Sequence, residues 1–131
     1  MDSHELIHRG GCHCGAVRFE FDAPAQITAY RCNCSICAMT DFLHIILPAR
    51  KFRLLEGHGK LLRYEFNTHV AKHQFCRVCG IKSFYTPRSN PDGVSVNYRC
   101  VDRKTIDRVV MEDFDGSNWE GNADLLAHLS G

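Results

Sequence analysis

The stretch Phe75-Cys76-Arg77-Val78-Cys79-Gly80 carries the pattern that decides the fold of this chain, two cysteines three residues apart followed by a glycine. Seven of the eight cysteines have such short spacings, and they form three groups: Cys12 and Cys14; Cys32, Cys34 and Cys37; Cys76 and Cys79. Thiolates spaced by two or three residues are typical of zinc sites, where distant groups complete a tetrahedron around one ion. The sequence therefore predicts a zinc-binding protein.

Counting ligands divides the clustered cysteines into two sites. A structural zinc takes four protein ligands, whereas a catalytic zinc keeps one position open. The two paired groups, which we call the four-cysteine centre, can close a four-sulfur tetrahedron. The group at 32–37, which we call the three-cysteine clip, has no fourth ligand within its spacing. We expect a structural zinc at the centre and a second, catalytic zinc at the clip.

A disulfide framework is the alternative interpretation of many cysteines in a small protein, because secreted domains use it to support a small core. The chain has no apolar stretch near its start beyond Leu6 and Ile7, which disfavours a secretory signal. The longest apolar run, Leu43 to Pro48, contains His44 and is too short to span a membrane. We expect a cytoplasmic protein, not bound to membranes, whose reduced thiols hold metal.

Composition predicts a single domain over residues 1–131 and argues against nucleic acid as a partner. The 131 residues are 44% hydrophobic and 24% charged, enough for one modest core that a metal site would help to stabilise. The formal net charge is only +1. No basic group is longer than Arg50, Lys51 and Arg53, whereas phosphate binding needs several concentrated cationic contacts.

The hydrophobic pattern is mainly β. Apolar and polar residues alternate at 16–22, 62–67 and 94–98, which predicts strands with one buried face. Further strands are expected at 27–31, 42–47, 70–75, 82–85 and 109–114, separated by turn signals rich in glycine and proline. Helix is expected only as one short turn at 36–40 and as a C-terminal amphipathic helix at about 122–129.

The two cysteine spacings predict different local structures. In an extended segment residues i and i+2 share a face, so Cys12 and Cys14, like the first two cysteines of the clip, are expected to present both sulfurs without a turn. A spacing of three needs a turn, which Gly80 can complete with a positive φ while backbone N–H groups point at the sulfurs. Gly15 is expected to act in the same way after Cys14.

The remaining cysteine and the histidines are the other candidate ligands. Cys100 is either a buried core residue, as free cysteines commonly are, or a thiol close to the clip that supplies its missing ligand. His13 should point away from the sulfurs of its neighbours and is a poor ligand. His44, His69 and His73 are expected to be ordinary surface or half-buried residues, although His44 is of interest because it follows the clip by seven residues.

The three cysteine motifs, at 10–15, 32–37 and 75–80, resemble the signature of the glutathione-dependent formaldehyde-activating family. Residues 66–69, 83–91, 100–102 and 114–120 are similar to the centromere protein V branch of that family. The resemblance extends from Gly10 to about Trp119 and so covers nearly the whole chain.

The resemblance implies a β-tent fold, in which stacked antiparallel sheets are held by zinc, and a single domain of this type with two zinc sites. It implies the same division as ligand counting: Cys12, Cys14, Cys76 and Cys79 are structural, and Cys32, Cys34 and Cys37 are catalytic. The family's named activity joins glutathione and formaldehyde into S-hydroxymethylglutathione and is classed as a carbon–sulfur lyase. An enzyme of this kind, with zinc as cofactor and a thiol such as glutathione as partner, is therefore expected.

The chemistry of an open three-thiolate zinc agrees with that activity. Such a zinc can bind a thiol, lower its pKa and hold the thiolate beside a small aldehyde. His44, Arg88 and Tyr98 are candidate donors for the developing alkoxide, although each is more commonly structural. Thiols add to formaldehyde readily without a catalyst. A non-catalytic, zinc-stabilised tent domain that binds a thiol or a protein partner therefore stays open as the alternative.

Overall fold

The computed structural model describes residues 5–32, 35–65, 72–87 and 92–114. These residues form strands, one short helix and three 3-10 turns. The strands are β1 (Glu5–Gly11), β2 (Arg18–Pro24), β3 (Gln26–Cys32), β4 (Leu43–Pro48), β5 (Phe52–Glu56), β6 (Leu61–Tyr64), β7 (Lys72–Cys76), β8 (Phe84–Thr86), β9 (Gly93–Asn97) and β10 (Arg108–Phe114). The helix is α1 (Ser35–Thr40), and the 3-10 turns are η1 (Ala49–Lys51), η2 (Tyr98–Cys100) and η3 (Arg103–Thr105).

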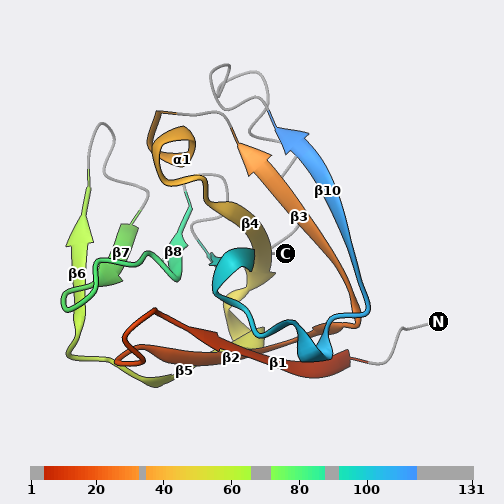
Figure 1. The fold of residues 1–131 in the computed structure, drawn as a ribbon, viewed down its shortest axis with the longest axis horizontal. Coiled ribbons are helices and arrows are strands. Elements are labelled where there is room, and N and C mark those ends of the chain that lie inside the picture. The colour runs from red at the N-terminus through yellow and green to blue at the C-terminus, as the bar shows by residue number, and fades with distance from the viewer. Residues whose placement is uncertain (1–4, 33–34, 66–71, 88–91, 115–131) are drawn as a thin grey trace.

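The strands form two sheets that meet at an angle (Figure 1). A three-stranded sheet has the order β1-β2-β5, and a seven-stranded sheet has the order β10-β3-β4-β9-β8-β7-β6. The strand pairs are antiparallel except β3 with β10, which is parallel. The chain reaches β10 at the end where β3 begins, since the Asp107 N–H donates to the Ala25 carbonyl oxygen at 2.9 Å.

Most of the sequence pattern corresponds to observed elements. The alternation at 16–22 predicted β2, in which Phe19 and Phe21 are fully buried, as is Val17 just before the strand. The short turn predicted at 36–40 is α1. Two strands, β1 and β5, were not predicted. The strand predicted at 62–67 is β6, but it is an edge strand and exposes most of its side chains, so it lacks the buried face that its alternation indicated.

The hydrophobic core lies between the two sheets. Side chains of β2 pack against one face of the seven-stranded sheet, which contributes Ile27, Ala29, Leu43, Ile45, Leu47, Phe84 and Val96. Phe19 links the two layers, because its ring lies 5.6 Å from Phe52 and 6.3 Å from Phe84 between centroids. Cys12 and Cys76 belong to the same cluster, so the four-cysteine centre borders the core.

The opposite face of the seven-stranded sheet is polar yet largely buried. Residues that face each other across paired strands lie on the same side of a sheet, and the register gives the pairs Tyr64 with His73, His73 with Tyr85, Tyr85 with Ser95, His44 with Asn97, and Tyr30 with His44. His44, His73, Tyr85, Ser95 and Asn97 are all buried. We call this side the polar face, in contrast to the core face.

Several sequence predictions fall on residues outside the described ranges. These are the C-terminal helix at 122–129, Cys34, His69 and Arg88. Within the described ranges, none of the helical segments is long and apolar enough to cross a membrane.

Candidate metal centre and the adjoining polar cluster

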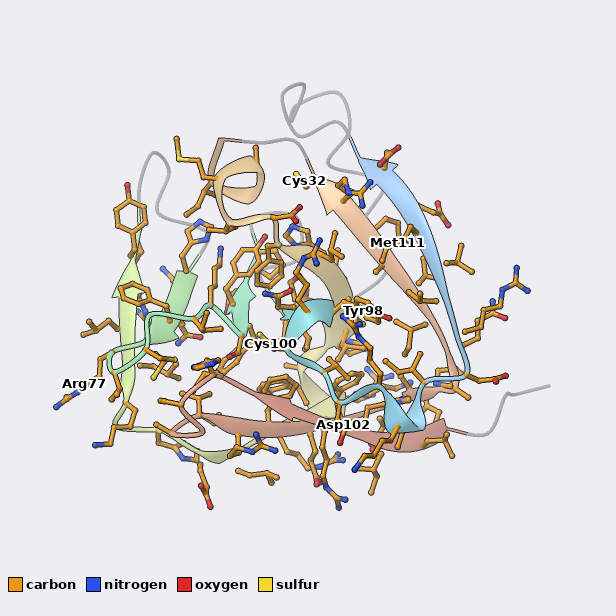
Figure 2. All side chains as sticks on the ribbon, in the orientation of Figure 1. Cys32, Arg77, Tyr98, Cys100, Asp102 and Met111 are labelled. Atoms are coloured by element: carbon orange, nitrogen blue, oxygen red, sulfur yellow. The ribbon has the colours of Figure 1, made fainter. Side chains whose placement is uncertain are left out.

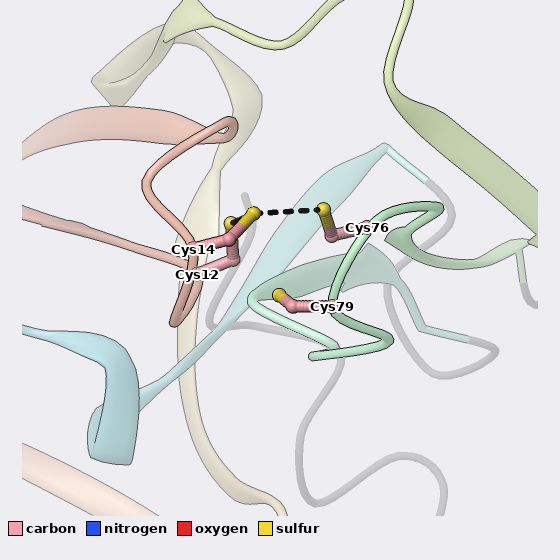
Figure 3. Close-up of side chains that lie close together, drawn as sticks. All are labelled: Cys12, Cys14, Cys76 and Cys79. Atoms are coloured by element: carbon pink, nitrogen blue, oxygen red, sulfur yellow. Dashed lines mark hydrogen bonds between the residues drawn. The ribbon is translucent and has the colours of Figure 1, made fainter.

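Four cysteine sulfurs converge where the end of β1 meets the end of β7 (Figure 3). The Sγ atoms of Cys12, Cys14, Cys76 and Cys79 all lie within 4.8 Å of one another. Cys14 Sγ lies 3.6 Å from Cys12 Sγ and 3.7 Å from Cys76 Sγ. A tetrahedral zinc with Zn–S bonds of about 2.3 Å separates its sulfurs by about 3.8 Å. The four-cysteine centre therefore has the dimensions that a tetrahedral thiophilic metal requires.

Both halves of the centre are turns. The Gly80 N–H donates to the Cys76 carbonyl oxygen at 2.8 Å, and Gly80 has φ +79°, as predicted. The Gly15 N–H donates to the Cys12 carbonyl oxygen at 3.2 Å, and Gly15 has φ +84°. The extended conformation predicted for Cys12 and Cys14 is therefore wrong. The chain must reverse between β1 and β2, which pair with each other, and the cysteines lie in that reversal.

Backbone N–H groups donate to the sulfurs. Val17 N lies 3.3 Å from Cys12 Sγ, and Val78 N lies 3.4 Å from Cys76 Sγ. Hydrogen bonds from the backbone of Cys14 and Ile81 lower the pKa of Cys79 to about 6. Because these donors stabilise thiolate, they prepare the site for a cation.

The neighbouring sulfurs raise the pKa of Cys14. The Ala16 backbone lowers the pKa of Cys14, but desolvation and hydrogen bonds with the other three cysteines outweigh it and raise this pKa to about 11. The backbone of Cys79, followed by that of Val78, lowers the pKa of Cys76 despite desolvation. Four close sulfurs resist full ionisation without a positive charge between them, so the donor set suits a bound divalent metal.

The three-cysteine clip is described only in part. Cys32 is the last residue of β3, and Cys37 lies on α1, although its side-chain placement and Cys34 are outside the description. Cys32 lies two residues beyond Tyr30, which pairs with His44, so the Cys32 side chain belongs to the polar face of the sheet. The metal ligand set of the clip stays a prediction.

A clamp fixes the end of α1. Asp41 follows the helix with φ +52°, a left-handed conformation that is uncommon for aspartate. Arg99 donates from Nη2 to Asp41 Oδ2 at 2.7 Å and from Nε to the Asp41 carbonyl oxygen at 3.1 Å. The backbone N–H of Arg99 donates in turn to Asn97 Oδ1 at 3.0 Å. Because a helix of six residues has little stability alone, contacts of this kind determine where α1 lies.

Cys100 lies beside the four-cysteine centre. Burial raises the pKa of the Cys100 thiol, and the charges of Cys12 and Cys79 raise it further. Figure 2 shows Cys100 in the middle of the molecule and Cys32 well above it near α1. Of the two interpretations that the sequence left open, the structure favours the partly buried core residue over a fourth ligand of the clip.

The polar face holds a connected group of buried side chains, which we call the polar cluster: Phe42, His44, His73, Lys82, Tyr85 and Ser95. Ser95 Oγ lies 2.8 Å from His44 Nδ1, and the Tyr85 hydroxyl lies 3.4 Å from the same nitrogen. The Phe42 and His44 rings are 4.6 Å apart between centroids. These contacts hold His44, the histidine closest in sequence to the clip, in one orientation.

Lys82 lies at the centre of the other half of the cluster. Its Nζ is 2.7 Å from His73 Nδ1 and 3.8 Å from the centroid of the Tyr85 ring. The His73 ring stacks on Tyr85 at 4.9 Å with an interplanar angle of 15°. Lys82 is only 9% exposed, and lysine is among the residues least often buried. Buried ionisable groups of this kind are common at functional sites.

Sequence reasoning found only part of this cluster. His44 was identified for its distance from the clip, whereas His73 was expected to be ordinary, and Lys82 and Tyr85 were not identified. The strand register, which brings 73, 85 and 95 into one row, was the missing information. Tyr98 is buried beneath Arg103, whose guanidinium carbon lies 5.1 Å from its ring centroid, and it belongs to the hydrophobic core cluster.

Comparisons with known proteins agree with the cysteine arrangement. The model of the family described as glutathione-dependent formaldehyde-activating enzyme matches residues 7–117. A Halomonas elongata protein assigned by name to these enzymes is 49% identical over 35 residues, which cover 27% of this chain and only 22% of that protein. A crystal structure of a Rhodobacter sphaeroides protein is similar with a TM-score of 0.65 and 33% identity, over 79% of this chain and 98% of that one. The family match covers most of the chain, which therefore belongs to the glutathione-dependent formaldehyde-activating enzyme family.

Proposed function

We propose that this protein is a zinc-dependent enzyme of the carbon–sulfur lyase type, which interconverts a thiol with its adduct to a small electrophile. Glutathione and formaldehyde are the substrates that the family name supports. Cys12, Cys14, Cys76 and Cys79 hold a structural zinc. Cys32, Cys34 and Cys37 hold a second zinc with one exchangeable position. A thiol-rich, reducing cytoplasm suits both the substrate and the free cysteines.

The observation that carries this proposal is that Cys76 and Cys32 lie on opposite faces of the seven-stranded sheet. Cys76 lies in the hydrophobic core cluster on the core face, where a bound metal would stabilise the packing. Cys32 lies on the polar face, which also carries His44, Tyr85 and Lys82. A site intended only for stability has no need of buried ionisable side chains nearby, since burying them costs free energy. Their position on the same face as Cys32 supports chemistry there.

The proposed reaction needs a thiolate, a carbonyl carbon and a stabilised oxygen. A zinc held by three cysteines would lower the pKa of an incoming thiol. The protein itself contributes position: β3 and α1 carry the clip, and the Arg99–Asp41 clamp fixes the end of α1. Placing thiol and aldehyde together replaces an encounter in solution by a bound geometry.

A second candidate function is a non-catalytic, zinc-stabilised domain that binds a thiol or a protein partner. It is favoured by the four-cysteine centre, which by itself accounts for metal binding and lies at the edge of the core. Under this proposal the polar cluster is structural and the clip holds either a second structural metal or none.

Cobalt substitution separates the two functions. Co(II) bound to thiolates absorbs through sulfur-to-metal charge transfer, and a fourth sulfur ligand changes that absorption. The cobalt-loaded protein should show stronger charge-transfer absorption when glutathione is added, and Cys37→Ser should abolish this increase. The signal of the four-cysteine centre should survive in the variant. A spectrum that responds to neither glutathione nor any other small thiol would favour the binding domain.

A further inference from the structure

Among the described residues, β6 is one of the two outermost strands of the seven-stranded sheet, at the left margin of Figure 1. We propose that β6 pairs antiparallel with β6 of a second copy of this chain, so that the two sheets join across a two-fold axis. This inference goes beyond the proposed function and does not depend on it, because the pairing involves no metal ligand.

The outer edge of β6 presents backbone groups to another strand. Hydrogen-bonded and non-hydrogen-bonded residue pairs alternate along two antiparallel strands. The Arg77 N–H donates to the Lys60 carbonyl oxygen at 2.8 Å, which makes these two residues a hydrogen-bonded pair. The register of β6 with β7 then places Leu61 and Arg63 in the intervening, non-hydrogen-bonded pairs. The N–H and C=O groups of Leu61 and Arg63 therefore point away from β7, toward the edge.

Strand β7 shows the same alternation from its own side. Cys76 is the residue opposite Leu61, and its N–H donates to the Ile81 carbonyl oxygen at 3.0 Å. This N–H is thus directed away from β6, as the alternation requires. An edge strand with outward N–H and C=O groups is a template for pairing with another chain.

The exposed side chains of β6 add an apolar surface to this edge. Leu62 and Tyr64 lie on one face of the strand and are 49% and 52% exposed. Leu61 points to the other face and packs against the hydrophobic core, so β6 itself is held in place. Covering Leu62 and Tyr64 with another strand would remove apolar surface from water, which favours a partner with apolar side chains at the matching positions.

The strand is complementary to itself in one register. A two-fold axis perpendicular to the sheet keeps each face on its own side, so opposing residues differ in number by zero or by an even number. If Arg63 of one copy opposes Arg63 of the other, their outward N–H and C=O groups bond reciprocally. Leu62 of each copy then opposes Tyr64 of the other in a non-hydrogen-bonded pair, where side chains approach most closely.

The charges on the opposite face suit the same register. Arg63 Nη1 lies 3.7 Å from Glu65 Oε2 of its own strand. In the paired strands, Glu65 of the second copy lies diagonally next to Arg63, so two arginines are flanked by two glutamates. Opposed arginines repel each other, and the flanking carboxylates offset that repulsion. A strand with both signs of charge therefore fits a second copy of itself better than a partner strand of one sign.

The symmetry has a consequence for the whole molecule. Because the axis is perpendicular to the sheet, the polar faces of both copies lie on the same side of the joined sheet. One pair of short strands buries less than the roughly 1,200 Å² of stable complexes, so the dimer should dissociate on dilution.

Sedimentation velocity of the zinc-loaded chain, from low micromolar to near-millimolar concentration, tests the pairing. The wild type should shift from monomer toward dimer. Leu62→Lys should raise the dissociation constant about tenfold or more, because it places a charge at two apolar positions of the interface. Leu55→Lys is the matched control, since Leu55 is 47% exposed on β5, and it should leave the constant unchanged. A wild type that stays monomeric over the whole range overturns the proposal.

Proline distinguishes backbone pairing from other contacts. Arg63→Pro removes an outward N–H and suits an extended edge strand, so the β6–β7 ladder should survive while the dimer is lost. Arg63→Ala keeps the N–H and should keep the dimer. Zinc content and melting temperature show whether each variant is folded. A dimer that persists in folded Arg63→Pro contradicts the pairing. If the proline variant does not fold, equal dissociation constants for Leu62→Lys and Leu55→Lys contradict it instead.

Amide hydrogen exchange locates the interface without a substitution. The Arg63 N–H should exchange rapidly in dilute protein and become protected as the concentration rises, because only the dimer gives it a partner strand. The Leu62 N–H, which points toward β7, should be protected at every concentration. Dimer formation with no change in exchange at Arg63 would place the interface elsewhere and overturn the pairing of β6.

Discussion

Cys76 and Cys32 each end a strand of the seven-stranded sheet, but they lie on opposite faces of it. Cys76 is 1% exposed and belongs to the core cluster, where two distant chain segments bring four sulfurs together. Cys32 leads directly into α1, and its predicted partners all come from one short segment. A metal at the first position therefore joins parts of the fold that are far apart in sequence, whereas a metal at the second only orders a local segment.

The largest difference between the two sites should appear in stability. Cys76→Ser should unfold the protein or lower its melting temperature strongly, because metal binding to a structural four-sulfur site contributes on the order of 10 kcal/mol. Cys34→Ser, in the clip, should leave the fold largely intact. Thermal melts of both zinc-loaded variants measure this directly. Equal melting temperatures would contradict the structural and catalytic assignments.

Lowering the pH should have a smaller effect than losing a cysteine, and this effect should be specific to the four-cysteine centre. Protons compete with metal for thiolates, and backbone donors lower the pKa of Cys76 and bring that of Cys79 to about 6. Since both pKa values are depressed, the folded protein keeps these thiolates while the unfolded chain takes up protons. The stability that they provide is therefore full above the ordinary thiol pKa of 9.0, declines as the pH falls, and is lost once the pH has passed through about 6.

A chromogenic chelator can follow zinc release from the centre in Cys34→Ser, which lacks a complete clip. The folded protein should keep its zinc at pH 7 and release it only below about pH 6, whereas the same protein in urea should release it at higher pH. Release from the folded protein at the pH seen in urea would show that the backbone donors do not set the affinity of the centre.

The smallest expected effect concerns the clamp that holds α1. Arg99 and Asp41 are 47% and 62% exposed, so their ion pair should be worth less than about 1 kcal/mol. Asp41→Gly should be nearly neutral in urea unfolding, because glycine relieves the positive φ as the ion pair is lost. Asp41→Ala, which loses the pair and keeps the strain, should be less stable by about 1 kcal/mol or more. Equal stabilities for the glycine and alanine variants would exclude strain at this position.

The comparison of the two sites also explains what the sequence could predict. Ligand type and spacing are local properties, so Cys12, Cys14, Cys76 and Cys79 could be grouped from the order of residues alone. The alternation in β2 and the short helix α1 were predicted for the same reason. The positive φ of Gly15 was predicted, but Cys12 and Cys14 were wrongly expected in an extended segment. A spacing of two fits both a strand and a tight reversal, and only the pairing of β1 with β2 distinguishes them.

The polar cluster could not be predicted, because it depends on register between strands that are distant in sequence. His73, Tyr85 and Ser95 meet only when β7, β8 and β9 pair in their observed alignment. A shift of one residue would move each side chain to the core face. Lys82 precedes β8 and had no periodic pattern to mark it, so its burial against Tyr85 became visible only in the folded chain.

Native mass spectrometry of the zinc-loaded protein tests the division into two sites most directly. The wild type should bind two zinc ions, of which a moderate chelator removes one, and Cys34→Ser should retain only the ion that resists the chelator. This result would show a closed structural centre and a separate open site. A wild-type protein that binds a single zinc, with the same affinity in Cys34→Ser, would contradict a metal at the clip and with it the central claim.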